Sequence, residues 1–232
     1  MDDQRIKQAI KHTEILRAPK QSLYTFGTTN IHYYLVTEPA YSELVKDSTE
    51  TVVREGKVIA ARPRLVTPYY LSHLEGFSSE ARRYFETLVK EHSSNIPGLF
   101  YTYSNEPKEL TIVSNNLLSV VAQLNAEIDK RGDPLAAIIK GEDALWDVSL
   151  MKFIYEVTRN SLQENLKQMS GRGLLDIDTA GIPADARVRI DELFEKVTRC
   201  ESEPGDLKDE LERWNLFEEY QDRFFNIFEK KR

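Results

Sequence analysis

The chain has little cysteine and no long apolar segment. Cys200 is its single cysteine, which excludes an internal disulfide and a zinc site built from cysteines. No apolar run approaches the roughly 18 residues that a membrane-spanning helix needs. The N-terminal residues also lack the apolar stretch of a secretory signal. These absences predict a soluble, cytoplasmic protein that does not associate with a membrane.

Motifs of the common catalytic and nucleotide-binding sites are missing as well. The sequence has no glycine-rich phosphate loop and no nucleophile elbow. The four histidines, His12, His32, His73 and His92, include no pair at the spacing of a helical zinc site. We therefore predict no cofactor and no metal site. An enzyme whose site is assembled from dispersed residues, for example His32 and His73, remains an alternative.

Basic charge is scarce relative to acidic charge, and it is unevenly distributed. The whole chain has a net charge of −7. Residues 1–76 hold 10 Lys+Arg against 9 Asp+Glu, whereas residues 77–232 hold 21 against 29. This balance argues against broad nonspecific binding of nucleic acid, although the first part of the chain can still carry a local basic patch.

The N-terminal half has the residue pattern of antiparallel β-hairpins. A helix is predicted over 2–17, followed by three strand pairs rich in Thr, Tyr, Val and Ile. The pairs join 22–26 to 30–37, 49–54 to 57–62, and 99–104 to 109–114. Glu55-Gly56 is interpreted as the tight turn of the second pair, because glycine supplies the backbone freedom that such a turn needs. Short helices are predicted over 67–76 and 79–92.

The C-terminal half has the 3.6-residue periodicity of helices. Helices are predicted from Asn115 or Asn116 to about Lys130, over 145–169, from Pro183 to about Arg199, and over the last 27 residues with a bend near Trp214-Asn215. The segment PLAAIIKG fits either a buried strand or a helical turn. The first half of the 145–169 helix is apolar almost all round, which predicts a core helix surrounded by other elements.

Together these elements predict an α+β, helix-rich fold. Antiparallel β-hairpins fill the N-terminal half, and the C-terminal half resembles a helical bundle. We expect an α+β lobe over residues 1–115 and an all-helical lobe over 116–232, joined as one continuous domain.

One candidate site is a basic segment around the second strand pair. Basic residues interleaved with aromatic ones can contact a phosphate backbone and stack on bases. The residues concerned are Arg54, Lys57, Arg62, Arg64, Tyr69 and Tyr70. The simpler alternative is an edge strand that its charges protect from aggregation.

The second candidate site is an aromatic stripe near the C-terminus. Its members recur at spacings of three or four residues: Trp214, Phe217, Tyr220, Phe224 and Phe228. Such a stripe either packs into the protein's own core or docks a partner, including a second copy of the chain.

The absence of catalytic motifs, together with this aromatic surface, predicts a non-catalytic interaction or adaptor protein. It would use the C-terminal aromatic helix, the strand edges, or both, and a homodimer is one form of it. The alternatives are the dispersed enzyme site and a nucleic-acid-binding or nucleotide-binding protein that uses the basic segment.

Overall fold

The computed structural model describes residues 2–41, 50–66 and 98–229. The chain forms two compact units, one of Met1–Arg62 with Tyr101–Leu166 and one of Pro63–Phe100 with Lys167–Arg232. Each of these units combines an early and a late segment of the chain. The division into two lobes at residue 115 stays a prediction. The helices predicted over 67–76 and 79–92 lie outside the described residues.

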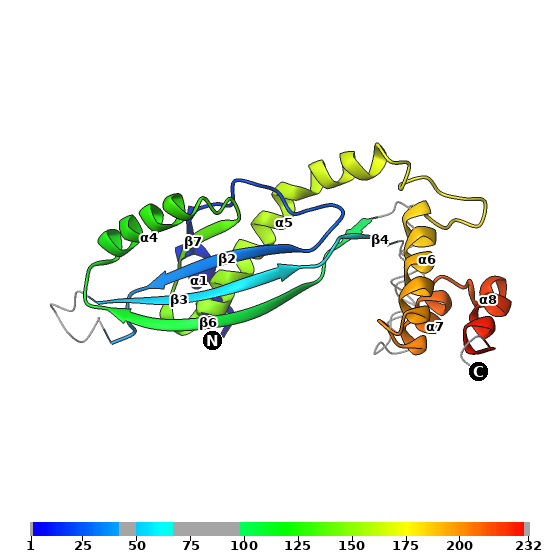
Figure 1. The fold of residues 1–232 in the computed structure, drawn as a ribbon. Coiled ribbons are helices and arrows are strands. Elements are labelled where there is room, and N and C mark those ends of the chain that lie inside the picture. Colours follow the sequence, from blue (N-terminus) through cyan, green and yellow to red (C-terminus); the bar gives the residue numbers. More distant parts are fainter. Residues whose placement is uncertain (1, 42–49, 67–97, 230–232) are drawn as a thin grey trace. The chain divides into compact units, whose positions relative to one another are not determined.

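The first unit is built on a mixed five-stranded sheet (Figure 1). Its strands, in spatial order, are β1 (Glu14–Arg17), β7 (Ala136–Lys140), β2 (Thr29–Thr37), β3 (Thr51–Ala60) and β6 (Tyr103–Val113). β7 and β2 run parallel, and every other neighbouring pair is antiparallel. The ambiguous segment PLAAIIKG therefore supplies a buried strand, and the late part of the chain contributes to the sheet.

Helices cover the two faces of this sheet. Helix α4 (Leu117–Arg131) packs its buried Val120 and Ile128 on one face, and α5 (Trp146–Ser170) packs Leu150 and Phe153 on the other. The sequence marks the ends of α4 correctly, since the Asn116 side chain accepts a hydrogen bond from the Ser119 N–H and Gly132 closes the helix with a φ of 67°. The fold class is therefore α+β and helix-rich, as predicted.

The strands are longer than the hairpin interpretation allows. β3 continues through Glu55-Gly56, and β6 continues through 105–108, so neither segment is a turn. Residues 22–26 form no strand, and β2 pairs with β3 instead. A Cβ at position 56 would lie 2.4 Å from the hydroxyl oxygen of Tyr33. Glycine is present because a neighbouring ring crosses the strand there, which is the other common reason for glycine within a strand.

Two further expectations need correction. Helix α1 is shorter than predicted (Asp2–His12), because the residues after Thr13 form β1 and pair with β7. The first half of α5 is not surrounded on all sides, since Met151 and Tyr155 are each 64% exposed. The helix buries one face against the sheet, and its apolar residues on the other side face solvent.

In the residues that the structure describes, the second unit combines a two-stranded sheet with three helices. These are β4 (Arg64–Val66), β5 (Gly98–Phe100), α6 (Ala184–Thr198), α7 (Pro204–Arg213) and α8 (Phe217–Glu229). Their core contains the fully buried Ile190, Leu207 and Leu211. The expected bend near Trp214 is a break between two helices, with a left-handed Asn215 (φ 55°) in the connection. None of the helices in the described residues has the length and apolar character needed to cross a membrane.

Candidate functional site

Strand β6 forms one edge of the five-stranded sheet (Figure 1). Among the described residues it pairs with β3 alone, so the hydrogen-bonding groups along its outer side have no partner strand there. Nearly all of its eleven residues are exposed, whichever face of the sheet they project from. A long unpaired edge is a template for another strand, and proteins usually protect it.

The N-terminal half of β6 carries such protection. Pro107 lacks a backbone N–H, and a β-bulge opposite Glu55-Gly56 inserts Lys108 as an extra residue. Two ion pairs tie this half to β3, with Lys57 Nζ at 2.8 Å from Glu106 Oε2 and Lys108 Nζ at 2.6 Å from Glu55 Oε1. Proline, bulge and charge are the features that discourage edge pairing.

The C-terminal half of β6, Glu109–Val113, has none of these features apart from Glu109. Leu110 and Ile112 are 57% and 52% exposed. Leu110 is in register with Arg54 of β3, which is in register with Leu35 of β2. Because Leu35 belongs to the core under α5, Leu110 and Ile112 lie on the α5 face of the sheet.

The flank of α5 nearest β6 is also apolar and exposed. The hydroxyl of Thr158 forms a hydrogen bond with the hydroxyl of Tyr103 at the start of β6. Met151 and Tyr155 precede Thr158 by seven and three positions, so the three residues lie along one stripe of the helix. Exposed apolar side chains therefore occur on the C-terminal half of β6 and on the flank of α5 that includes Thr158. We call the segment Glu109–Val113 the open edge.

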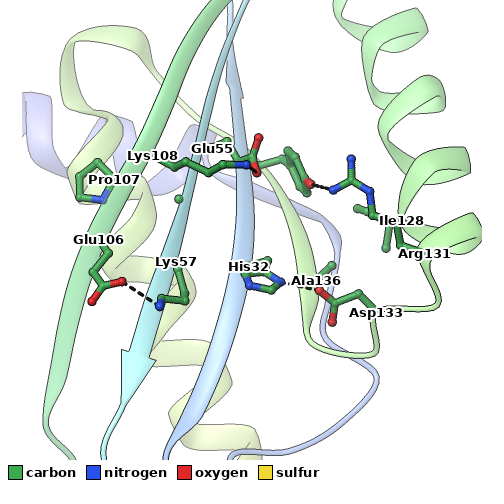
Figure 2. A pocket seen from close by; sticks show the side chains of 12 residues that line it. His32, Glu55, Lys57, Glu106, Pro107, Lys108, Ile128, Arg131, Asp133 and Ala136 are labelled. Atoms are coloured by element: carbon green, nitrogen blue, oxygen red, sulfur yellow. Dashed lines mark hydrogen bonds and ion pairs between the residues drawn. The ribbon is translucent and has the colours of Figure 1, made fainter.

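On the opposite face, a cavity of about 520 Å³ lies between the strands and the C-terminal end of α4 (Figure 2). Its charged and polar lining comes from β2, β3, β6 and the end of α4: His32, Tyr34, Glu55, Lys57, Glu106, Lys108, Arg131 and Asp133. Gly56, Pro107, Ile128 and Ala136 complete it. We call it the His32 cavity.

Most charges in the His32 cavity are matched in pairs. His32 Nδ1 donates to Asp133 Oδ2 at 2.6 Å, beside the two Lys–Glu pairs already described. Partial burial alone would raise the pKa of Asp133, but hydrogen bonds from His32 and from the Leu135 N–H, with the charge of Arg131, hold it below its usual value. Asp133 is thus an ionised carboxylate that orients the imidazole.

A second cavity, of about 710 Å³, lies at the opposite end of β7, between α1 and the segments that follow β2 and β7. His12 Nδ1 donates to Glu142 Oε1 at 2.7 Å, and Lys140 Nζ lies 3.2 Å from Glu14 Oε1. Both histidines in the described part of the chain are therefore paired with a carboxylate. His73 and His92 lie outside it.

The predicted basic residues have different surroundings in the structure. Arg54 and Lys57 project from opposite faces of β3; Arg54 Nη2 lies 2.8 Å from Asp143 Oδ1, and Lys57 is paired with Glu106. The Arg62 guanidinium lies over the Phe26 ring in the first unit. Arg64 belongs to the second unit, where it lies over the Phe100 ring and 3.9 Å from Glu210. Tyr69 and Tyr70 lie outside the described residues.

The aromatic stripe mostly forms the core of the second unit. Trp214 is only 2% exposed and donates its ring N–H to Glu210, and Phe224 is also buried. Phe217 and Tyr220 are partly buried against the same core. Phe228 is exposed at the outer side of α8. The stripe therefore has a packing role for four of its five members.

Sequence reasoning did not single out Leu110, Ile112, Arg131 or Asp133. The first two alternate with polar residues, which is typical of any half-buried strand, and their edge position depends on pairing with a distant strand. Arg131 and Asp133 lie on either side of the cap residue Gly132 and resemble ordinary surface charges. Only the fold places them beside His32.

No protein-family model, curated protein or solved structure matches the chain. Within the described residues, no group of three or more His, Cys, Asp or Glu side chains is arranged to hold a metal ion.

Proposed function

We propose that the protein is a non-catalytic interaction protein that binds a partner protein by strand addition at the open edge. In strand addition, backbone hydrogen bonds supply affinity and alternate side chains supply specificity. The observation that carries the proposal is the contrast within β6. Its first half has proline, a bulge and paired charges, whereas its second half exposes Leu110 and Ile112 along an edge that pairs with no further strand in the described part of the chain.

A second copy of the chain is the partner that the sequence of β6 favours. Antiparallel pairing of two β6 strands about Thr111 would place Leu110 of each copy opposite Ile112 of the other, on the same face of the extended sheet. Glu109 would face Val113, so no like charges would oppose each other. Cross-strand apolar pairs stabilise a sheet, and a two-fold axis makes this contact close on itself.

The oligomeric state tests this proposal directly. Size exclusion with light scattering is run on the full chain from about 10 μM to about 500 μM, because small interfaces are weak. We expect the wild type to shift toward dimer as its concentration rises, and Ile112→Lys to remain monomeric, since lysine on an edge strand opposes pairing. The matched control is Leu118→Lys, at a 79% exposed residue of α4, which covers the face of the sheet opposite to Leu110 and Ile112.

Hydrogen exchange locates the contact. The amides of Glu109–Val113 should exchange more slowly in the wild type at high concentration than at low concentration, and Ile112→Lys should remove the difference. A wild type that stays monomeric, with concentration-independent exchange in this segment, would contradict the proposal. Loss of dimer in Leu118→Lys as well would place the interface elsewhere.

The alternatives from the sequence have weaker support. Nucleic-acid binding by the basic segment requires cations on one surface, yet Arg54 and Lys57 lie on opposite faces of β3 and each pairs with a carboxylate. For the dispersed enzyme site, the described residues show His32 paired with Asp133, in surroundings that favour binding of a ligand, while His73 lies outside them.

A further inference from the structure

The His32 cavity is separate from the open edge. His32 is in register with Lys57 and Glu106, whereas Leu35 is in register with Arg54 and Leu110. Since His32 and Leu35 lie an odd number of residues apart on β2, the two rows project from opposite faces of the sheet. A volume of about 520 Å³ is within the range of small-molecule sites.

The β-bulge in β6 helps to form this cavity. Bulges change which residues of a strand face a given side, and they occur often beside functional sites. Here the extra residue is Lys108, whose ammonium reaches Glu55 within the cavity. Contact with that carboxylate raises the pKa of Lys108, so the side chain is charged at neutral pH.

Three carboxylates line the cavity, and each is already bound by a neighbouring cation or imidazole. Glu55 is paired with Lys108, Glu106 with Lys57, and Asp133 with His32 (Figure 2). Their capacity to attract a further cation is therefore largely used.

Arg131 is the exception among the lining cations. Its Nη1 donates to the Tyr34 hydroxyl at 2.9 Å, which is a neutral partner. Among the described residues its ion-pair partner is Glu127 at 3.3 Å, an exposed i,i+4 neighbour that does not line the cavity. Its charge also acts on the nearby Asp133 carboxylate. Exposed helical pairs of this kind contribute little, so the guanidinium can turn toward a ligand at small cost.

His32 adds a second donor. Its Nδ1 is engaged by Asp133, and His32 makes no other hydrogen bond to any residue that the structure describes. The Nε2 atom is therefore open to a ligand, and it donates to an anion when both ring nitrogens carry a proton, since Nδ1 already donates to Asp133.

We infer that the His32 cavity binds a small organic molecule through a carboxylate or phosphate group, held by Arg131 and His32. A guanidinium matches two oxygens of such a group at once, and a charged hydrogen bond is stronger than a neutral one. The Tyr34 ring, Pro107 and Ile128 provide apolar contacts for the body of the molecule. Lys57 and Lys108 offset the repulsion from the nearby carboxylates.

Three probes of one shape test the chemistry: phenyl phosphate, benzoate and uncharged phenol. Binding to the full chain is followed by NMR, using the amide shifts of Gly56 and His32, which report on the cavity itself. We expect saturable shifts with phenyl phosphate, benzoate or both, and none with phenol at the same concentration. The anion with the lower dissociation constant identifies which group the site prefers.

Two variants and one control assign the residues. Arg131→Gln and His32→Gln should each weaken binding of the preferred anion at least about tenfold, as expected for loss of a charge-assisted hydrogen bond. Lys130→Gln is the matched control, since it removes the same charge at the neighbouring exposed residue, which does not line the cavity. It should leave the dissociation constant within about twofold, because exposed charges at a distance are screened.

Several results would overturn the inference. These are no saturable shift with either anion, equal binding of phenol, or an equal loss of affinity in Lys130→Gln and Arg131→Gln. Because Arg131 and His32 are both substantially exposed, the variants should fold, and their unfolding midpoints are measured beside the titrations. A folded Arg131→Gln that binds as tightly as the wild type would also refute the site.

Discussion

At the scale of single residues, Gly56 shows how a local signal can have a distant cause. The ring of Tyr33 on β2 crosses over position 56 on β3, and its hydroxyl donates to Asn105 on β6 at 3.0 Å. Any side chain at position 56 would overlap this ring. The glycine thus allows one tyrosine to link three strands.

We predict that Gly56→Ala destabilises the protein by about 1–3 kcal/mol, the usual cost of overpacking a close contact. The measurement is urea unfolding. In a Tyr33→Leu background the same substitution should cost much less, because the shorter side chain leaves room for the methyl group. The control is Gly27→Ala, where an added Cβ meets no atom within 4 Å. Equal costs in both backgrounds would contradict the steric explanation.

Asp143 is the residue whose charge most directly links the sheet to the segment before α5. It accepts hydrogen bonds from the Thr37 hydroxyl and the Ala40 N–H, and it forms an ion pair with Arg54. Burial alone would raise its pKa, but these partners hold the pKa below its usual value. A pKa that is lower in the folded state than in the unfolded state means that the ionised carboxylate stabilises the fold. This stabilisation is fully present above the unfolded pKa of about 4, and it is lost as the pH falls through the folded pKa.

We therefore predict that Asp143→Asn lowers the free energy of unfolding at pH 7 by about 1–3 kcal/mol, as for a charged hydrogen-bonded group. The difference from wild type should shrink as pH falls below about 4, the unfolded pKa, because the wild-type carboxylate also becomes neutral once the pH passes its lowered folded pKa. Urea unfolding at several pH values measures it. Glu38→Gln, at an exposed neighbour just after β2, should change little at any pH. A pH-independent difference for Asp143→Asn would rule out the ionic origin.

At the scale of elements, helix α5 contributes buried polar contacts as well as an apolar face. Its buried polar residues bind the chain that connects β1 to β2. The Ser161 hydroxyl accepts a hydrogen bond from the Leu23 N–H at 3.0 Å. The Asn165 amide donates to the Leu23 carbonyl at 3.0 Å and to the Thr25 hydroxyl at 2.9 Å. These contacts satisfy backbone groups of a connection that belongs to no strand.

We predict that Asn165→Ala destabilises the first unit by about 1–3 kcal/mol, because it leaves buried acceptors without a donor. In this variant the backbone amides of Leu23–Thr25 should exchange hydrogen faster than in the wild type, while the amides of the strands keep their slow exchange. Asn160→Ala on the exposed side of α5 is the control, and it should be neutral or slightly stabilising, since alanine is the better helix former. If both variants behaved alike, the contact to Leu23 would have no stabilising role.

Comparison of these elements with the sequence shows which signals are local. The two ends of α4 could be predicted because each cap residue, Asn116 and Gly132, forms its capping hydrogen bonds with residues of the helix turn next to it. The extents of β3 and β6 could not be predicted, because Gly56 and Pro107 are residue types typical of turns. In this fold, Gly56 is explained by the Tyr33 ring that crosses it, and Pro107 by its position on an edge strand. Exposure of Met151 and Tyr155 was missed for the same reason, since it depends on what lies beside α5.

The candidate sites follow the same division. The open edge and the His32 cavity are created by strand order, which brings residues from β2, β3 and β6 together with the end of α4. Composition and spacing showed no catalytic motif, but they could not indicate that His32 forms a hydrogen bond with Asp133, about a hundred residues later. The aromatic stripe was recognised, while its burial around Trp214 depended on α6 and α7.

At the scale of the whole molecule, the two compact units have separate hydrophobic cores. The cluster around Ile190, Leu207 and Leu211 draws all of its buried members from the second unit. The clusters on the two faces of the sheet draw all of theirs from the first unit. The two tryptophans of the chain fall one in each unit, Trp146 in the first and Trp214 in the second. Each is thus a natural fluorescent reporter of the unit that contains it.

We predict that Leu211→Ala lowers the stability of the second unit by about 2–5 kcal/mol, the cost of a cavity at a fully buried leucine. In a Trp146→Phe background, the fluorescence of Trp214 should report a clearly lower urea midpoint. In a Trp214→Phe background, Trp146 should report a smaller shift, because the described members of the altered cluster all belong to the second unit. Leu207→Ala should repeat this result, whereas Phe153→Ala in the first unit should reverse it. Equal shifts of both reporters for every variant would mean that the two cores unfold as a single cooperative unit.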